Sequence, residues 1–484
     1  TRLPMMAVDE AWCYGQPVAI VIAEDERTAR YAASRIQVDY TPKEPVVDAE
    51  KAIAKGARSV VPEWDDNVLI YVPFMNGDTQ AAFDQADKIV TTDVKIHRFS
   101  SQPMETRCYN AVWEHDTESI TLYGTCQNPH PLRLVLAETL RMNENKIRII
   151  ASTIGGAFGL KMHGHPEEPL ICLMTKLIRR PVKWVENREE CLLIGAREQQ
   201  HKVEMAFDSD GNMTGLRDHF LANIGAPSAC PGWGMAFLTG LTMPGPYKVE
   251  NIDVHMNAVT TNKPSWNAAR GYGKESTAIA LELAMDNAAR QFGISPIDLR
   301  LKNFITKEQF PYPSPTGLVY DSGDYGGVLL KALETIGYED WKDKQKAALA
   351  EGRHIGIGMA FELTPEGGTI PGTMVAGYDS SSVRVGPDGT VRVLTGITSP
   401  GTHNGTAIAQ IVADELGIDM DRIEVLQGDT NSSPYGFGNY SGRSTIVGGG
   451  SAALAAKDVR DKINAVAAAL LEVEIDTLSL SEGV

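Results

Sequence analysis

The chain lacks the sequence features of iron–sulfur, membrane-spanning and nucleic-acid-binding proteins. Its six cysteines include no C-x-x-C pair and no other short-spaced set, whereas iron–sulfur clusters need closely spaced thiolates. Its longest apolar stretches, such as 465–471, fall well short of a membrane span. Its net charge of −17 would repel phosphate backbones. We therefore expect no cluster on this chain, no membrane span and no nucleic-acid partner.

What remains is the composition of an ordinary globular protein. The 484 residues are 43% hydrophobic and 22% charged, and a chain of this length predicts two to four domains. A protein this large does not need disulfides for stability, so the cysteines are interpreted as reduced thiols of a cytoplasmic protein.

Alternating strand and helix patterns predict a mixed α/β protein with two boundaries. The first boundary is the proline-rich stretch 41–47, which follows a predicted strand at 18–23, a helix at 25–36 and a strand at 36–40. The second boundary is 306–324, which is rich in Pro, Gly and Tyr. Further predicted strands are 146–151, 181–185, 391–395 and 423–427. Further predicted helices are one after Pro129 with a common face at 132, 135, 136 and 140, then 166–178, 276–292, 406–416 and about 450–471. Aspartate–glycine turns at 208–211 and 387–389 predict two strand pairs.

Four glycine-rich segments, each leading toward a helix, are the candidates for chemistry. They are G-G-A-F-G at 155–159, R-G-Y-G at 270–273, G-T-H-N at 401–404 and the segment 438–444. Each alone is a weak signal, because glycine connections, a paired arginine and helix capping explain them equally well. None is a G-x-G-x-x-G or P-loop motif. Together, four such loops would suit a large cofactor that carries several phosphates.

The order in which the motifs occur along the chain resembles that of a known protein family. Besides the four loops, the chain contains G-Q-P-V-A at 15–19, P-M-E at 103–105, T-C-Q-N at 125–128, R-P-V-K at 180–183, N-R-E-E at 187–190, L-R-x-x-N at 299–303, the helix segment 409–417 and G-D-T at 428–430. Over nearly its whole length the chain resembles the xanthine oxidase/aldehyde oxidoreductase family of molybdenum hydroxylases.

The resemblance implies a fold and a set of cofactors. The fold would be a mixed αβ (α+β) multidomain one: the C-terminal part of an α/β hammerhead domain at 1–50, then two elongated molybdenum-cofactor-binding domains. The first of these two domains would be residues 58–310. The second would start at residue 325 and include the rest of this chain, 325–484, and we expect its C-terminal part beyond this chain. Molybdenum would be held through molybdopterin, in its cytosine dinucleotide form, with no direct protein ligand assigned. The 2Fe–2S clusters and FAD are expected on partner subunits, in a dimer of heteromers.

The resemblance also implies roles for particular residues. Gln127 would hydrogen-bond an oxygen ligand of the metal, with Phe158 and Arg270 beside it as the catalytic set; a surface amide is the alternative for Gln127. Tyr272 and Met162 would line the substrate site, although Tyr272 could instead be a core aromatic. The remaining residues expected to bind the cofactor are Gly156, Ala157, Gly159, Gly271, Gly401, Thr402, Asn404, Ser441, Gly442, Arg443 and Ser444. The catalytic base would be a glutamate beyond residue 484.

Departures from the family pattern reduce the number of substrate classes that we expect. G-T-H-N at 401–404 stands where the family usually has G-Q-G-H, and Ala157 replaces the third glycine of G-G-G-F-G. Met162 replaces the purine-binding glutamate, and Gly271 stands where the carbon-monoxide-oxidising branch has a copper-binding cysteine. Aldehydes and N-heteroaromatic rings remain as the expected small-molecule substrates, with electrons passing to iron–sulfur and flavin partners.

Alternative interpretations remain open. The altered 401–404 segment would also suit an inactive or CO-dehydrogenase-like relative that acts as an assembly subunit, whereas a stand-alone flavin or nicotinamide enzyme lacks any fingerprint. His163, His165 and Cys172 could suggest zinc, but structural zinc requires a closed set of four ligands. We interpret these three as loop residues.

Overall fold

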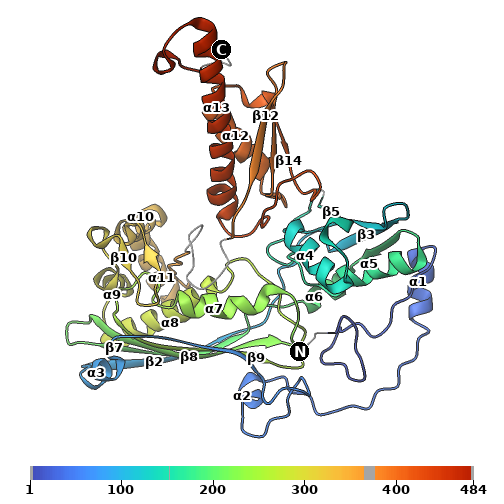
Figure 1. The fold of residues 1–484 in the computed structure, drawn as a ribbon. Helices are drawn as coiled ribbons and strands as arrows, with labels where there is room; N and C mark the ends of the chain where they lie inside the picture. The colour runs from blue at the N-terminus through green and yellow to red at the C-terminus, as the bar shows by residue number, and fades with distance from the viewer. Residues whose placement is uncertain (1–3, 152, 365–376, 481–484) are drawn as a thin grey trace.

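The computed structural model describes residues 4–151, 153–364 and 377–480. Three units of secondary structure are visible in Figure 1: a long sheet covered by helices, a smaller sheet with its own helices, and a C-terminal unit dominated by one long helix. Residues 365–376 and 481–484, which belong to the predicted second cofactor-binding domain, lie outside the described residues.

The largest unit is built on a five-stranded sheet with the order β1-β9-β8-β7-β2. Its strands are β1 (Val68–Asn76), β2 (Lys88–Ile96), β7 (Gln199–Phe207), β8 (Met213–Gly225) and β9 (Asn251–Thr260). All neighbours are antiparallel except β8 and β9, which are parallel. Alternate side chains such as Leu216 and Phe220 are fully buried because successive residues of a strand point to opposite faces. The buried face packs on α7 (Gly234–Leu241) and α8 (Lys274–Phe292) (Figure 1).

The second unit holds the sheet β5-β4-β3-β6 and its helices. The strands are β3 (Cys108–Glu114), β4 (Ser119–Gly124), β5 (Ile147–Ile150) and β6 (Val182–Val185), and the helices are α4 (Pro129–Leu140), α5 (Glu167–Ile178) and α6 (Arg188–Leu193). Its core includes Ile120, Leu122, Leu132 and Leu136, all fully buried. The loop from β4 to α4 and the loop from β5 to α5 carry residues of the predicted site.

The third unit packs α12 (Asn404–Leu416) and α13 (Gly450–Leu471) on the sheet β12-β13-β14. The strands are β12 (Ser381–Val385), β13 (Val391–Thr395) and β14 (Ile423–Leu426). Small residues at Ala452 and Ala456 are fully buried, which allows α13 to approach its neighbours closely. A π-helix at Ser444–Gly449 runs directly into α13, and such segments are frequent at functional sites.

Shorter elements complete the chain. They are α1 (Glu26–Ala33), α2 (Ala49–Ala52), α3 (Thr79–Asp84), α9 (Pro296–Asn303), β10 (Tyr312–Pro313), β11 (Val319–Tyr320), α10 (Tyr325–Ile336), α11 (Tyr338–Ala350) and the 3-10 turns at 144–146, 231–233, 307–309, 420–422 and 475–477. Within the described residues, no helix is both long and apolar enough to cross a membrane. All six cysteines are free thiols, as predicted.

Two predicted strands are wrong. Residues 18–23 and 36–40 form no strand, and apolar side chains of the first run are exposed, with Val18 at 39% and Ile20 at 37%. A β-strand exists only through its hydrogen-bond ladder with a neighbour, and none of the described residues supplies one here. The helix between them is also shorter than predicted. The other predicted strands and helices are confirmed, with ends that differ by up to two residues.

Candidate cofactor site

Gln127 lies at the meeting point of the predicted loops. Its side chain is 3% exposed; Oε1 accepts a hydrogen bond from the backbone N–H of Gly159 at 3.1 Å. Its Nε2 donates to the carbonyl oxygen of Asn439 at 2.9 Å. The backbone carbonyl of Gln127 accepts from Thr398 Oγ1 at 2.6 Å. Gln127 is therefore a buried link between the second and third units, and not the surface amide of the alternative interpretation.

The G-G-A-F-G loop is stacked on the segment that leads to Arg270. Gly159 has φ +95°, and a Cβ there would lie 2.7 Å from the carbonyl oxygen of Ala268, so only glycine fits this close approach. Asn267 strengthens the contact, since its Nδ2 donates to the carbonyl of Leu160 at 2.9 Å. Beside this junction the ring of Phe158 is 47% exposed.

Each of the four predicted loops holds one non-glycine residue in the left-handed region of φ. These are Phe158 at +54°, Tyr272 at +52°, His403 at +54° and Ser441 at +57°. Such a conformation costs on the order of 1–3 kcal/mol and persists where the surrounding structure enforces it, often at ligand sites. The four loops therefore share a backbone conformation that the surrounding structure must hold in place, although helix ends such as Arg141 and Arg179 also adopt it.

The 401–404 and 438–444 segments meet through Asn439. Its Nδ2 donates to Thr402 Oγ1 at 2.9 Å and to the carbonyl of Thr398 at 3.2 Å. Gly438 has φ +75°, and a Cβ there would lie 2.2 Å from the carbonyl oxygen of Gln127. Gly401, in contrast, faces open space with no atom within 4 Å of a built Cβ. The loops are thus fixed to one another on one side and free on the other.

Arg443 is turned into the fold. Its guanidinium is 1% exposed, forms an ion pair with the buried carboxylate of Asp379, and donates to the carbonyls of Gly438 at 2.6 Å and Tyr378 at 3.1 Å. Burial raises the pKa of Asp379 to about 6, against the attraction of Arg443. The charge of Arg443 therefore holds its own loop, while Ser441 and Gly442 are exposed.

Further residues of the predicted site lie where the second and third units meet. Asn404 is buried and donates through Nδ2 to the carbonyl of Thr398 at 2.9 Å. The hydroxyl of Ser444 is buried without a hydrogen-bond partner among the described residues, which is unusual for a buried polar atom. Ala157 is also buried, and Gly156 has φ +86° against the ring of Phe158.

The R-G-Y-G segment presents Arg270 to solvent, whereas Tyr272 is partly buried. The side chain of Arg270 is exposed, and its carbonyl accepts a hydrogen bond from Arg197. The hydroxyl of Tyr272 donates to the carbonyl of Pro231 at 2.7 Å, its ring packs against the core, and burial raises its pKa. At Gly271, φ is +98° and a Cβ would lie 2.2 Å from Glu275 Oε2.

Met162 is buried, at 8% exposed, so its side chain does not reach an open surface in this structure.

The neighbouring Lys161 forms an ion pair with Glu105. Lys161 Nζ donates to Glu105 Oε2 at 2.6 Å, and the same oxygen accepts from Gly155 N at 2.8 Å. Burial lowers the pKa of Lys161. Sequence reasoning assigned no role to Glu105, although the P-M-E motif contains it.

The end of the G-G-A-F-G loop is held by a buried carboxylate. Glu168 accepts hydrogen bonds from the backbone N–H groups of Gly164 at 2.9 Å and His165 at 3.2 Å, and from the Tyr109 hydroxyl at 3.0 Å. Burial raises the pKa of Glu168 to about 7 and lowers that of His165 to about 3. Cys172 lies in the hydrophobic core. His163 and His165 lie in the loop before α5, as interpreted from the sequence, but Cys172 lies within α5, so its interpretation as a loop residue is wrong. Among the described residues, no group of potential metal ligands includes any of the three.

Comparison with known protein families identifies the family to which the chain belongs. A family described as "Molybdopterin cofactor-binding domain" matches residues 61–304, and a second family of the same description matches residues 331–484. The chain belongs to the molybdopterin-binding large subunits of the xanthine oxidase family. Residues 1–44 match the family "Aldehyde oxidase and xanthine dehydrogenase, a/b hammerhead domain". The predicted mixed αβ multidomain fold is confirmed; its exact domain boundaries remain predictions.

Named relatives agree with this family. The chain is 31% identical to the nicotine 6-hydroxylase large subunit of Paenarthrobacter nicotinovorans over 99% of its own length and 60% of the relative's. It is 33% identical to the carbon monoxide dehydrogenase large chain of Afipia carboxidovorans, covering 97% of this chain and 61% of that one. The chain thus spans about 60% of the length of these curated relatives.

Solved structures have the same fold. Quinoline 2-oxidoreductase from Pseudomonas putida 86 matches with a TM-score of 0.94 and 31% identity, over 100% of this chain and 62% of that one. The Cu,Mo-CO dehydrogenase in its carbon monoxide reduced state matches with a TM-score of 0.92 and 32% identity, over 99% of this chain and 64% of that one.

Proposed function

We propose that this chain forms part of the catalytic subunit of a molybdenum hydroxylase that oxidises an aldehyde or an N-heteroaromatic ring. The observation that carries the proposal is the position of Gln127, whose buried amide joins Gly159 to Asn439. That link brings together the loops that sequence reasoning assigned to one cofactor.

The residues present fit molybdopterin. Its dinucleotide form is large, polar and anionic, so it requires backbone N–H donors, hydroxyls and little side-chain bulk. The junction offers open backbone at Gly401, exposed residues at Thr402 and Ser441, and the unpartnered hydroxyl of Ser444. When bound, the cofactor would supply the redox centre. The cytosine dinucleotide form is our proposal, and the likeness to carbon monoxide dehydrogenase supports it.

The chain's own residues would position the cofactor and shield it from water. Gln127 and the backbone at Phe158 and Gly159 would contact the metal end, together with Arg270, whose exposed side chain has no partner among the described residues. Gly156, Ala157 and Gly271 would shape the loops around it. Thr402, Asn404, Ser441, Gly442 and Ser444 would face the pterin and its phosphates. Arg443 would act through its loop, because its guanidinium is directed to Asp379.

The structure supports the narrowed substrate class. A cysteine at Gly271 would have to adopt φ +98°, which L side chains rarely do, and would require the Glu275 carboxylate to move. This backbone conformation disfavours the copper-binding residue of the carbon-monoxide branch. Met162, where purine enzymes have glutamate, is buried and apolar. The relatives named for nicotine and quinoline favour an N-heteroaromatic ring, and the half-exposed ring of Phe158 offers a stacking surface for it.

The partners would be an iron–sulfur subunit, a flavin subunit and the remaining C-terminal molybdopterin-binding part, in a cytoplasmic dimer of heteromers. Relatives named as a large subunit, a large chain and a complex subunit support a multi-subunit assembly.

The test is to purify the complex that contains this chain from its native host. Molybdenum is counted by mass spectrometry, and the pterin is measured as the fluorescent product that oxidation releases. A panel of aldehydes and N-heterocycles is then assayed with a dye as electron acceptor. We expect molybdenum, pterin and oxidation of at least one ring compound; a complex without molybdenum or pterin would refute the proposal. That result would favour an assembly subunit instead, for which the altered segment around His403 is the supporting observation.

A further inference from the structure

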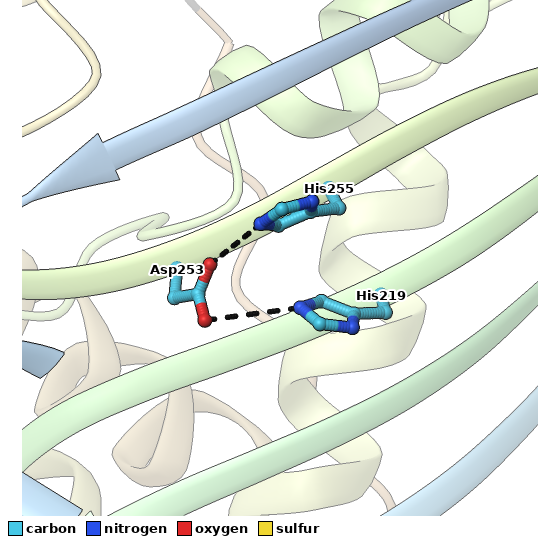
Figure 2. Close-up of side chains that lie close together, drawn as sticks. All are labelled: His219, Asp253 and His255. Carbon is cyan, nitrogen blue, oxygen red and sulfur yellow. Dashed lines mark hydrogen bonds and ion pairs between the residues drawn. The ribbon is translucent and has the colours of Figure 1, made fainter. Parts of the chain in front are cut away.

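We propose that the outer face of the five-stranded sheet binds a divalent transition-metal ion through His219, Asp253 and His255. Figure 2 shows the Asp253 carboxylate between the two imidazole rings. Across the described part of the chain this is the one group of three potential ligands whose donor atoms lie within 4.8 Å of one another. Two imidazoles and one carboxylate are a common ligand set for zinc and other divalent transition metals.

The sheet's register creates the cluster. His219 on β8 pairs directly with His255 on the parallel neighbour β9. The residues that flank these histidines, among them Phe220 and Val254, are fully buried, so strand alternation directs both imidazoles to the opposite face. Asp253 precedes His255 by two residues and therefore lies on that same face.

The donor atoms lie near enough to one another to reach a single metal ion after small shifts. His255 Nε2 lies 2.7 Å from Asp253 Oδ1, and His219 Nε2 lies 3.8 Å from Asp253 Oδ2. Ligands at about 2.0–2.1 Å from a tetrahedral zinc ion are roughly 3.3 Å apart. The two distances end on different oxygens of Asp253, so the carboxylate must either bind through both oxygens or turn to offer one. In the first case one pair must separate and the other must close by about half an ångström, which the 53% exposed side chain of His219 can accommodate.

Neighbouring side chains already orient the ligands. The hydroxyl of Tyr71 lies 2.6 Å from His255 Nδ1, and a tyrosine hydroxyl can accept as well as donate. When Nε2 binds a metal, Nδ1 must carry the proton and donate it, and Tyr71 is placed to accept. Arg217 donates to Asp253 Oδ2 at 3.1 Å. Such outer hydrogen bonds are usual around metal-binding histidines and carboxylates.

The charge of Arg217 opposes a cation, and other groups reduce that effect. Its guanidinium lies 3.6 Å from Glu204 and 4.4 Å above the ring of Phe83.

The hydrophobic core separates the cluster of His219, Asp253 and His255 from α7 and α8 on the other face of the sheet. The proposed site is therefore distinct from the cofactor loops, and its open coordination position faces solvent.

The test counts zinc on the intact complex. Wild-type protein and three variants are treated with a mild chelator, dialysed against micromolar zinc chloride, and analysed by mass spectrometry for zinc per chain. We expect His219→Gln and His255→Gln to bind one zinc fewer than wild type. The control His115→Gln, which changes an exposed histidine in the turn between β3 and β4, should bind the wild-type number.

Two further measurements make the result specific. X-ray absorption at the zinc edge should show two imidazole nitrogens and an oxygen donor for the zinc that the variants lack. Zinc should also raise the melting temperature of wild type more than that of His219→Gln. Equal zinc in all four proteins, or an equal loss in His115→Gln, would overturn the proposal. If His255→Gln does not fold, His219→Gln decides alone, because that side chain is half exposed.

Discussion

Replacing Gln127 by methionine tests whether this amide holds the cofactor loops together. Methionine has a similar length and volume but no hydrogen-bonding group to match either partner. The variant removes the bond from Gly159 N–H to Oε1 and the bond from Nε2 to the Asn439 carbonyl. The substitution therefore isolates the two hydrogen bonds from the packing of the side chain.

The size of the effect follows from burial. Asn439 is 7% exposed, so its carbonyl is left without a partner at a cost of about 1–3 kcal/mol. Gly159 is partly exposed, and water can replace the lost bond there, which limits that cost to about 1 kcal/mol. Together we expect a loss of about 2–4 kcal/mol. For a domain of 150–250 residues this lowers the melting temperature by roughly 4 °C or more.

The assay is thermal unfolding of the intact complex, followed by circular dichroism and by molybdenum content. The control is Gln85→Met, which changes an exposed glutamine at the end of α3 and should alter stability by no more than about 0.5 kcal/mol. Gln127→Met should melt earlier and retain less molybdenum than this control. Unfolding of Gln127→Met at the wild-type temperature would show that the buried amide does not join the loops.

Three other changes probe the framework of the site. Gly438→Ala should destabilise more than Gly56→Ala in urea unfolding, because both positions have positive φ but only the first would clash, at 2.2 Å; equal losses would contradict the close approach. Burial raises the pKa of Glu168 from 4.5 to about 7, so the native state binds this proton more tightly than the unfolded chain. Stability should fall by about 3 kcal/mol as pH rises from about 4.5 to 7, and Glu168→Gln should flatten that slope; an unchanged slope would refute the assignment. Arg107→Met should cost about 3–5 kcal/mol in urea unfolding, because it leaves the fully buried carboxylate of Glu186 unpaired; a near-neutral result would argue against the ion pair.

Local patterns located part of the secondary structure, although none of the predicted ranges covers β1 to β4 or β9. The helix predicted at 276–292 is α8 at Lys274–Phe292, and Gly293 ends it with φ +68°. The strand predicted at 391–395 is β13. Helical periodicity, caps and glycine stops are encoded within a few residues, so the sequence contains what is needed to locate them.

The pairing of strands is not encoded in this way. Residues 18–23 have the composition of a strand and form none, because a strand also needs a partner. The order β1-β9-β8-β7-β2 joins segments nearly 200 residues apart, and no local pattern specifies it. The same register brings His219 beside His255, so the proposed metal cluster could not be seen in the sequence.

The sequence alone determined the family, through glycine-rich loops, a glutamine and an arginine in a recognisable order, and it predicted which loops form the candidate cofactor site. Tertiary structure decided what each side chain does. The Arg443 guanidinium is directed to Asp379 and the Met162 side chain is buried, and neither placement can be inferred from the sequence. The roles expected for these two residues toward cofactor and substrate stay predictions. The physical reason is that glycine spacing reflects local backbone geometry, whereas the direction of a side chain depends on which distant group can satisfy its charge or cover its apolar surface.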